Sequence, residues 1–180
     1  MTAIDGLLGT RTDTHWCSGC GDYVALDTVQ ALLPGLGLGQ IVVYTGIGCA
    51  VRTSLSVDID GVHVVHGQQP AAAASLATRR PDLSVWVVIR DGHTMMAGGN
   101  ELITAMQRNA ELKILLYDNQ PDPLSLQCGI SFLARVSYAD RPTLVDVLTA
   151  AGKHRGAALV QVRPKGQRVS PAGILRQVQH

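Results

Sequence analysis

The chain has 180 residues, which is enough for one domain with a substantial core. Its 15 lysines and arginines nearly balance its 14 aspartates and glutamates, so the charge gives no basis for binding nucleic acid or an anionic membrane surface. No apolar run is long enough to span a membrane and no signal peptide is apparent, so we expect a cytoplasmic protein.

Short apolar runs alternate along the chain with amphipathic or alanine-rich stretches. Residues 1–14 are expected to form a polar arm and residues 166–180 a polar tail, with a single domain over residues 15–165. The regular alternation and the abundance of Val, Leu and Ala predict an α/β fold with a doubly wound parallel sheet. Strands are expected at 41–44, 62–65, 82–89, 112–117, 131–136 and 158–162, and helices at 22–33, 70–78, 101–108 and 143–151.

Oxygen-bearing side chains follow two of these strands. Asp91 comes after strand 82–89, and Asn119 comes after strand 112–117. Neighbouring parallel strands end at the same edge of a sheet, so this carboxylate and this amide oxygen would open on one crevice. Hard oxygen ligands of this kind suit Mg²⁺ that keeps phosphate oxygens in its remaining positions. The alternative is that both are ordinary turn residues at strand ends.

Two glycines, Gly98 and Gly99, lie just before the expected helix 101–108. The free N–H groups and the dipole at a helix N-terminus favour a bound diphosphate. Together with the two strand ends, these glycines outline a site for a metal-bound diphosphate at the carboxyl edge of the sheet.

The chain contains four cysteines, two of them closely spaced. In a cytosolic protein such cysteines more often bind metal or act in redox chemistry than form disulfides. The glycines around the first pair allow a tight turn that brings both thiols to one point. Soft thiolates bind iron or zinc. The four are Cys17, Cys20, Cys49 and Cys128.

The residue patterns of these motifs resemble those of the beta subunit of 2-oxoacid:ferredoxin oxidoreductases. The matching segments come in the family's order and cover roughly residues 16–162, which makes them far more specific together than any one of them alone. The resemblance implies the thiamine diphosphate-binding fold of the diphosphate-domain type. The segments are 16–22, 46–49 with Arg52, 63–67, 91–120 and 132–159.

The resemblance also implies roles for individual residues. Asp91 and Asn119 would ligate Mg²⁺ together with the carbonyl of Pro121. The catalytic residues would be His66, facing the thiazolium ring and the substrate carboxylate, and Arg52, binding that carboxylate. Their structural alternatives are a histidine that caps a carbonyl and an arginine that pairs with a surface acid. The implied cofactor-binding residues are Gly48, Cys49, His66, Gly67, Asp91, Gly92, His93 and Asn119.

In the family the cysteines hold a [4Fe–4S] cluster that takes electrons from the cofactor. Cys17, Cys20 and Cys49 match three of its ligands, whereas Lys165 stands near the place of the fourth. Cys128 is the remaining candidate and would reach the cluster if its loop folds back. The alternatives are that Cys128 is a buried free thiol and that zinc occupies the thiolates.

Several other positions depart from the family pattern. Arg90 stands where the family has glycine, His93 where it has an acid, and Gln68 where it has a basic residue. The loop 121–127 replaces a glycine-rich loop, and the long segment that follows it in the family is largely missing. These differences surround the expected site and bear on cofactor affinity and substrate choice.

The activity implied by the resemblance is oxidative decarboxylation of a 2-oxoacid by thiamine diphosphate. Electrons would pass through the iron–sulfur cluster to ferredoxin or a similar acceptor. In the family the glutamate that activates the cofactor comes from another subunit or domain, so the implied partner is a pyrimidine-binding alpha subunit. Three rival interpretations stay open: a non-oxidative 2-oxoacid decarboxylase subunit without the cluster, a catalytically decayed scaffold, and a zinc-stabilised interaction domain.

Overall fold

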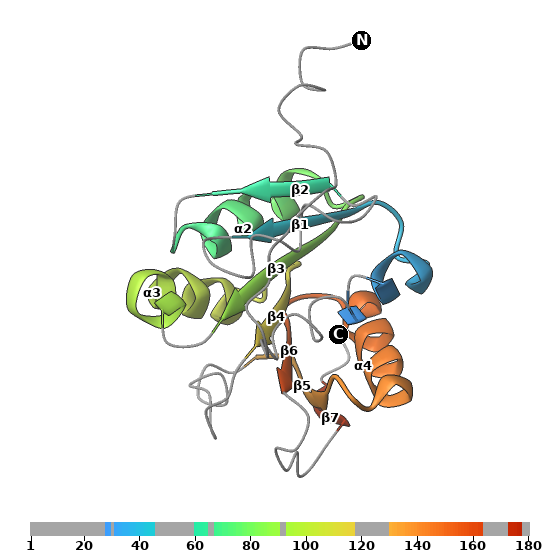
Figure 1. Cartoon of the computed structure of the whole chain (residues 1–180). Coiled ribbons are helices and arrows are strands. Elements are labelled where there is room, and N and C mark those ends of the chain that lie inside the picture. Colours follow the sequence, from blue (N-terminus) through green and yellow to red (C-terminus); the bar gives the residue numbers. More distant parts are fainter. Residues whose placement is uncertain are drawn as a thin grey trace, which may run out of the picture.

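A computed structural model of the chain describes residues 28–29, 31–45, 60–64, 67–90, 93–117, 130–163 and 173–177 (Figure 1). Within these residues seven strands form one sheet in the order β2-β1-β3-β4-β6-β5-β7. Strands β1 to β6 pair in parallel, and β7 runs antiparallel to β5 at one edge. The strands are β1 (Ile41–Thr45), β2 (Asp60–His63), β3 (Ser84–Arg90), β4 (Lys113–Tyr117), β5 (Phe132–Ser137), β6 (Ala158–Arg163) and β7 (Gly173–Gln177).

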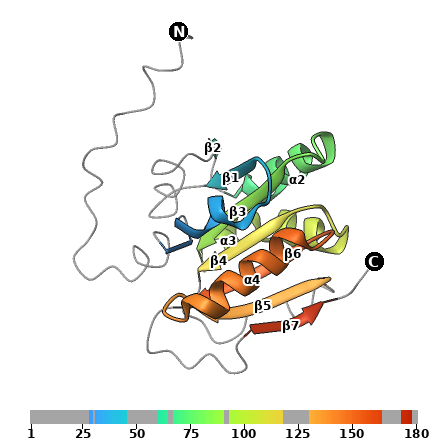
Figure 2. The same cartoon turned by 90° about the vertical axis from the view of Figure 1, so that its right-hand side faces the viewer.

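Helices cover both faces of the sheet (Figures 1 and 2). Helices α2 (Gln69–Arg79) and α3 (His93–Gln107) pack on one face. Helix α4 (Arg141–Lys153) packs on the other face together with the short 3₁₀ helix η1 (Leu33–Leu36). This arrangement confirms the predicted doubly wound α/β fold.

The central strands are apolar on both sides because each side meets a layer of helices. In β4, Leu115 faces the core beneath α4, whereas Ile114 and Leu116 face the core beneath α2 and α3. In β3, Trp86 lies in the α4 core and is fully buried. Continuous apolar runs such as these were the signal from which the strands could be read.

Helix α4 shows how local sequence sets a helix end. The side chain of Asp140 caps its N-terminus by accepting a hydrogen bond from the Thr143 N–H at 3.3 Å, and a proline occupies the first turn. The buried residues Leu144, Val147, Leu148 and Ala151 then recur at the spacing of one helix face.

Most expected elements in the described part of the chain agree with the structure to within a few residues. The predicted helix 101–108 begins earlier, at His93, and is interrupted at Gly98. The expectation that strand 158–162 is the last one was wrong, because β7 (Gly173–Gln177) follows it within the stretch assigned to the tail. An edge strand that ends in arginine and glutamine lacks the long apolar run of a central strand. The arm 1–14 and most of the helix 22–33 lie outside the described residues.

None of the helices in the part of the chain that the structure describes is both long enough and apolar enough to cross a membrane.

Candidate functional site

The strands that precede Asp91 and Asn119 are immediate neighbours. Strands β3 and β4 pair in parallel from Trp86 opposite Lys113 to Arg90 opposite Tyr117. Both therefore end at the same edge of the sheet, at the same level, and neighbouring strands are about 4.8 Å apart. The expectation that the two segments leave the sheet side by side is thus confirmed for the strands themselves.

The residues that follow these strands lie outside the described part of the chain, and so do most of the other predicted site residues. Gly67 and the backbone of His93 are described. The roles assigned to all of these residues stay predictions. The predicted residues outside the described ranges are Cys17, Cys20, Gly48, Cys49, Arg52, His66, Asp91, Gly92, Asn119, Pro121 and Cys128.

Helix α3 is broken near its start by Gly98, whose φ of −149° and ψ of 18° are not helical. The helix resumes after this residue, so Gly99 and Asn100 begin a second helical segment close to the predicted start. Gly98 and Gly99 are both buried. The break therefore sets a helix N-terminus against the interior at the carboxyl edge of β3, where an anion would be favoured.

Gly67 lies in the turn between β2 and α2 and meets this break directly. Its φ is +86°, in the left-handed region that favours glycine. A Cβ built on Gly98 would lie 2.2 Å from the carbonyl oxygen of Gly67. The sequence suggested Gly67 as a cofactor residue through family resemblance, but it carried no sign of this contact with Gly98.

Gln69, the first residue of α2, was not singled out from the sequence. This residue is 2% exposed, and its Oε1 atom has no hydrogen-bond partner among the residues that the structure describes. A buried acceptor without a donor is costly unless a ligand or another chain supplies one. An unsatisfied acceptor and a glycine-lined helix start at one edge of the sheet fit a bound ligand with both hydrogen-bonding and anionic groups.

At the opposite, amino edge the structure is a dense side-chain network centred on Lys113. This residue is 3% exposed, and its Nζ donates to the Glu111 carboxylate and to the carbonyls of His154 and Gly156, the last at 3.0 Å. Burial lowers the pKa of Lys113, and the neighbouring Glu111 carboxylate opposes that shift. The Glu111 carboxylate also accepts the Gly156 N–H at 2.7 Å.

Asn109 extends this network to the beginning of β5. Its Oδ1 accepts from the Ser131 hydroxyl at 2.6 Å and from the Ala157 N–H at 2.9 Å. The Ser131 hydroxyl also lies 2.8 Å from the Nε2 atom of His154. Asn109 and His154 belong to segments that resemble the family, and these contacts give both a role in joining three loops.

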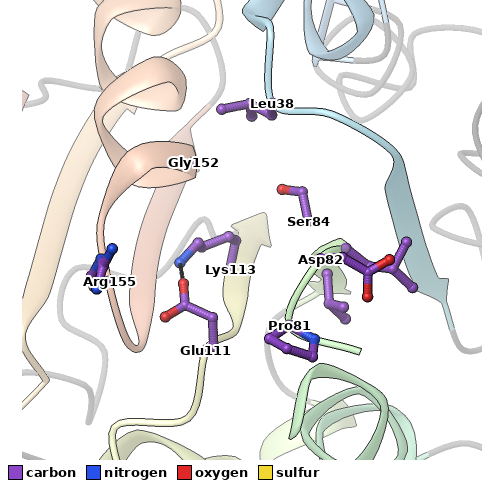
Figure 3. Close-up of a pocket in the computed structure, with 10 residues that line it drawn as sticks. Leu38, Pro81, Asp82, Ser84, Glu111, Lys113, Gly152 and Arg155 are labelled. Carbon is purple, nitrogen blue, oxygen red and sulfur yellow. Dashed lines mark hydrogen bonds and ion pairs between the residues drawn. The ribbon is translucent and has the colours of Figure 1, made fainter. Parts of the chain in front are cut away.

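A cavity of about 450 Å³ lies beside this network, at the amino ends of β3 and β4 (Figure 3). Lys113, Glu111 and Arg155 line one side, and Asp82 and Ser84 line the other (Figure 3). Asp82 pairs with Arg80 on the surface, and the hydrogen bonds from this arginine lower the pKa of the Asp82 carboxyl. This cavity lies at the amino ends of β3 and β4, whereas the predicted cofactor site is expected beyond their carboxyl ends, so the cavity is a different feature.

Comparison with known proteins finds a matching family and relatives in sequence. Residues 37–124 match the family described as thiamine pyrophosphate enzyme, C-terminal TPP binding domain. The 2-oxoglutarate oxidoreductase subunit KorB of Mycobacterium tuberculosis is 39% identical, with 83% of this chain and 49% of the relative covered. The 2-oxoglutarate synthase subunit KorB of Archaeoglobus fulgidus is 28% identical, with 91% and 74% covered. This chain thus spans about half the length of the Mycobacterium relative.

Solved structures share the fold. The 2-oxoglutarate:ferredoxin oxidoreductase from Magnetococcus marinus matches with a TM-score of 0.79 and 21% identity, covering 95% of this chain and 84% of that chain. Benzoylformate decarboxylase from Polynucleobacter necessarius matches with a TM-score of 0.55 and 17% identity, covering 86% and 33%. The chain is a homologue of the beta subunits of 2-oxoacid:ferredoxin oxidoreductases, built on the thiamine pyrophosphate-binding fold.

Proposed function

We propose that the chain is the diphosphate- and Mg²⁺-binding beta subunit of a cytoplasmic, thiamine diphosphate-dependent 2-oxoacid oxidoreductase. The observation that carries the proposal is the parallel pairing of β3 and β4, which brings the strands before Asp91 and Asn119 to one edge. The match of residues 37–124 to a thiamine pyrophosphate-binding domain supports the same assignment. Since relatives are named for 2-oxoglutarate, this 2-oxoacid is the first substrate to test.

Three oxygen ligands from this chain would hold the metal. We assign them to the carboxylate of Asp91, the side-chain amide of Asn119 and the carbonyl of Pro121. Mg²⁺ demands an octahedral set of oxygens at about 2.1 Å and keeps positions for phosphate oxygens and water. Three protein ligands on adjoining loops therefore leave room for the diphosphate that the metal would tether.

The backbone near the break in α3 would receive the diphosphate. Gly98 and Gly99 place backbone without side chains at the start of a helical segment, where N–H groups and the helix dipole attract negative charge. Neighbouring loops would complete the cradle around the cofactor. We assign these contacts to Gly48, Cys49, His66, Gly67, Gly92 and His93.

Two residues would act on the substrate side of the cofactor. Arg52 would bind the substrate carboxylate through its planar fork, and His66 would donate a hydrogen bond to the carboxylate beside the thiazolium ring. When thiamine diphosphate is bound, it supplies the carbanion chemistry that removes CO₂ from the 2-oxoacid. The residues of this chain would hold and orient the cofactor and the 2-oxoacid and would compensate the negative charge of the substrate carboxylate.

An iron–sulfur cluster would carry away the two electrons released by the oxidation, one at a time, to ferredoxin or a similar acceptor. We assign Cys17, Cys20 and Cys49 as its ligands, with Cys128 as the candidate fourth. A pyrimidine-binding alpha subunit would complete the active site. That this chain spans about half of its Mycobacterium relative is one reason to test activity only in the assembled complex.

The proposal is tested by co-purifying the chain with its partner under anaerobic conditions and measuring thiamine diphosphate, Mg²⁺, iron and sulfide. We expect about one thiamine diphosphate per chain and absorbance near roughly 400 nm from the cluster. Bound thiamine diphosphate without iron would favour the non-oxidative decarboxylase, which the lysine at position 165 also favours. Absence of Mg²⁺-dependent thiamine diphosphate binding would contradict the proposal altogether.

A further inference from the structure

Two backbone segments that are distant in the sequence touch at Gly67 and Gly98. A Cβ on Gly98 would lie 2.2 Å from the Gly67 carbonyl oxygen and 2.8 Å from both its carbonyl carbon and its Cα. A Cβ and another heavy atom essentially never approach within 3.0 Å. A methyl group at residue 98 would therefore push the two backbones apart by about 1 Å.

Neither side of this contact has an easy way to yield. The clash is with backbone atoms rather than with the end of a flexible side chain, and Gly67 is held at a φ of +86°. Gly67, Gly98 and the adjoining Gly99 and Gln69 are all buried. Close packing around them resists the movement that a side chain would force.

The contact joins segments that leave the sheet on either side of β1. Gly67 follows β2 and precedes α2, whereas Gly98 follows β3 and lies within α3. Strands β2 and β3 are the two neighbours of β1 in the sheet. Helices α2 and α3 then run together over one face and share a core (Figure 1). The two segments thus meet in a direct backbone-to-backbone contact, in addition to the core that their helices share.

We propose that Gly67 and Gly98 are positioning residues that hold the turn after β2 and the second segment of α3 at the separation needed for thiamine diphosphate. This inference rests on the proposed function. It adds that two glycines act through backbone contact with one another, not only through contact with the cofactor. A shift of about 1 Å in a binding element is enough to reduce its productive engagement by about tenfold or more.

The test is the affinity for thiamine diphosphate of the full chain in complex with its partner, measured by calorimetric titration in saturating Mg²⁺. Gly98→Ala should raise the dissociation constant by about tenfold or more. The matched control is Gly152→Ala in α4, whose Cβ would meet the Leu38 side chain at 2.3 Å at the opposite edge. Gly152→Ala should leave the dissociation constant within about twofold, because the Leu38 side chain can turn aside. Gly35→Ala, whose Cβ would meet no described residue within 4 Å, should change neither the dissociation constant nor the melting temperature.

A second measurement uses the wild-type complex alone and tests whether the segments around Gly67 and Gly98 respond together to the cofactor. Hydrogen exchange should show that thiamine diphosphate protects the segments around residues 67–69 and 98–100 together. Protection of only one segment, or an unchanged dissociation constant in a folded Gly98→Ala complex, would overturn the inference and leave the proposed function standing. Failure of the wild-type complex to bind thiamine diphosphate would overturn both.

Discussion

The two edges of the sheet are built in different ways. In the described residues, the amino edge is closed by charged and polar side chains, with the Lys113 amino group tied to Glu111, His154 and Gly156. The carboxyl edge is shaped by glycine backbone, with Gly67 against Gly98, and by the unsatisfied amide oxygen of Gln69. Side-chain networks hold loops in one arrangement, whereas glycine backbone and a hydrogen-bond acceptor without a donor leave groups that a ligand can contact. We infer that the amino edge maintains the fold and the carboxyl edge serves the cofactor.

The largest effect is expected at the carboxyl edge, where a substitution should weaken cofactor binding without changing the stability of the fold. Asp91→Ala should weaken Mg²⁺-dependent binding of thiamine diphosphate by about a hundredfold or more, because it removes the carboxylate that we propose as a metal ligand. The melting temperature of the cofactor-free complex should stay within about 2 °C of the wild-type value. Calorimetric titration and a thermal scan measure the two quantities. Asp146→Ala, at an exposed position of α4, is the control, and unchanged affinity in Asp91→Ala would refute the metal assignment.

At the amino edge the reverse pattern is expected. Lys113→Met leaves two carbonyls and a carboxylate without their buried donor and should lower the free energy of unfolding by about 3 kcal/mol. The side chain of Glu111 is 42% exposed and can turn to water, which keeps the loss from being larger. Chemical denaturation measures the loss, with Lys153→Met at an exposed position as the control. A marked change in cofactor affinity in this variant would contradict the division of roles between the edges.

A smaller effect is expected at Asn109, which combines two hydrogen bonds with a φ of 51°. Asn109→Ala should cost about 2 kcal/mol, because the Ala157 N–H and the Ser131 hydroxyl lose their shared acceptor. Asn109→Gly loses the same hydrogen bonds but tolerates a positive φ, so it should be more stable than the alanine variant by about 1 kcal/mol. Equal stability of the two variants would show that the backbone conformation carries no cost.

The smallest effect is a dependence on pH that comes from Lys113. Because burial lowers its pKa in the folded chain, the unfolded chain binds more protons between that pKa and the ordinary value of 10.5. Stability from this residue should therefore increase as the pH rises through that window. The difference in unfolding free energy between wild type and Lys113→Met, measured from neutral to alkaline pH, should grow with pH. A difference that is flat or falls would indicate that the hydrogen bonds to the charged amino group outweigh its burial.

The sequence was sufficient for the main architecture because the central strands are buried on both sides. Runs such as the one over residues 114–117 are apolar at every position, and their alternation with helices predicted a parallel sheet. Strand β7 could not be predicted from the sequence, because an edge strand need not be buried on both sides and therefore lacks a long apolar run.

The contacts that distinguish the two edges could not be read from the sequence either. Lys113 meets His154 and Gly156 across more than forty positions, and each of these residues looks like a surface residue in isolation. The approach of Gly67 to Gly98 depends on β1 lying between β2 and β3 in the sheet. Such contacts depend on topology and packing, for which short-range patterns carry no signal.

A crystal structure of the full complex, grown with thiamine diphosphate and with Mn²⁺ in place of Mg²⁺, would test the proposed metal site most directly, because anomalous scattering locates the metal. Mn²⁺ accepts the same hard oxygen ligands and gives a signal that Mg²⁺ lacks. We predict a single anomalous peak beyond the ends of β3 and β4, within about 2.3 Å of oxygens from both Asp91 and Asn119. A peak that contacts only one of these residues, or that lies at the amino edge near Lys113, would contradict the assignment of Asp91 and Asn119 as ligands of one ion.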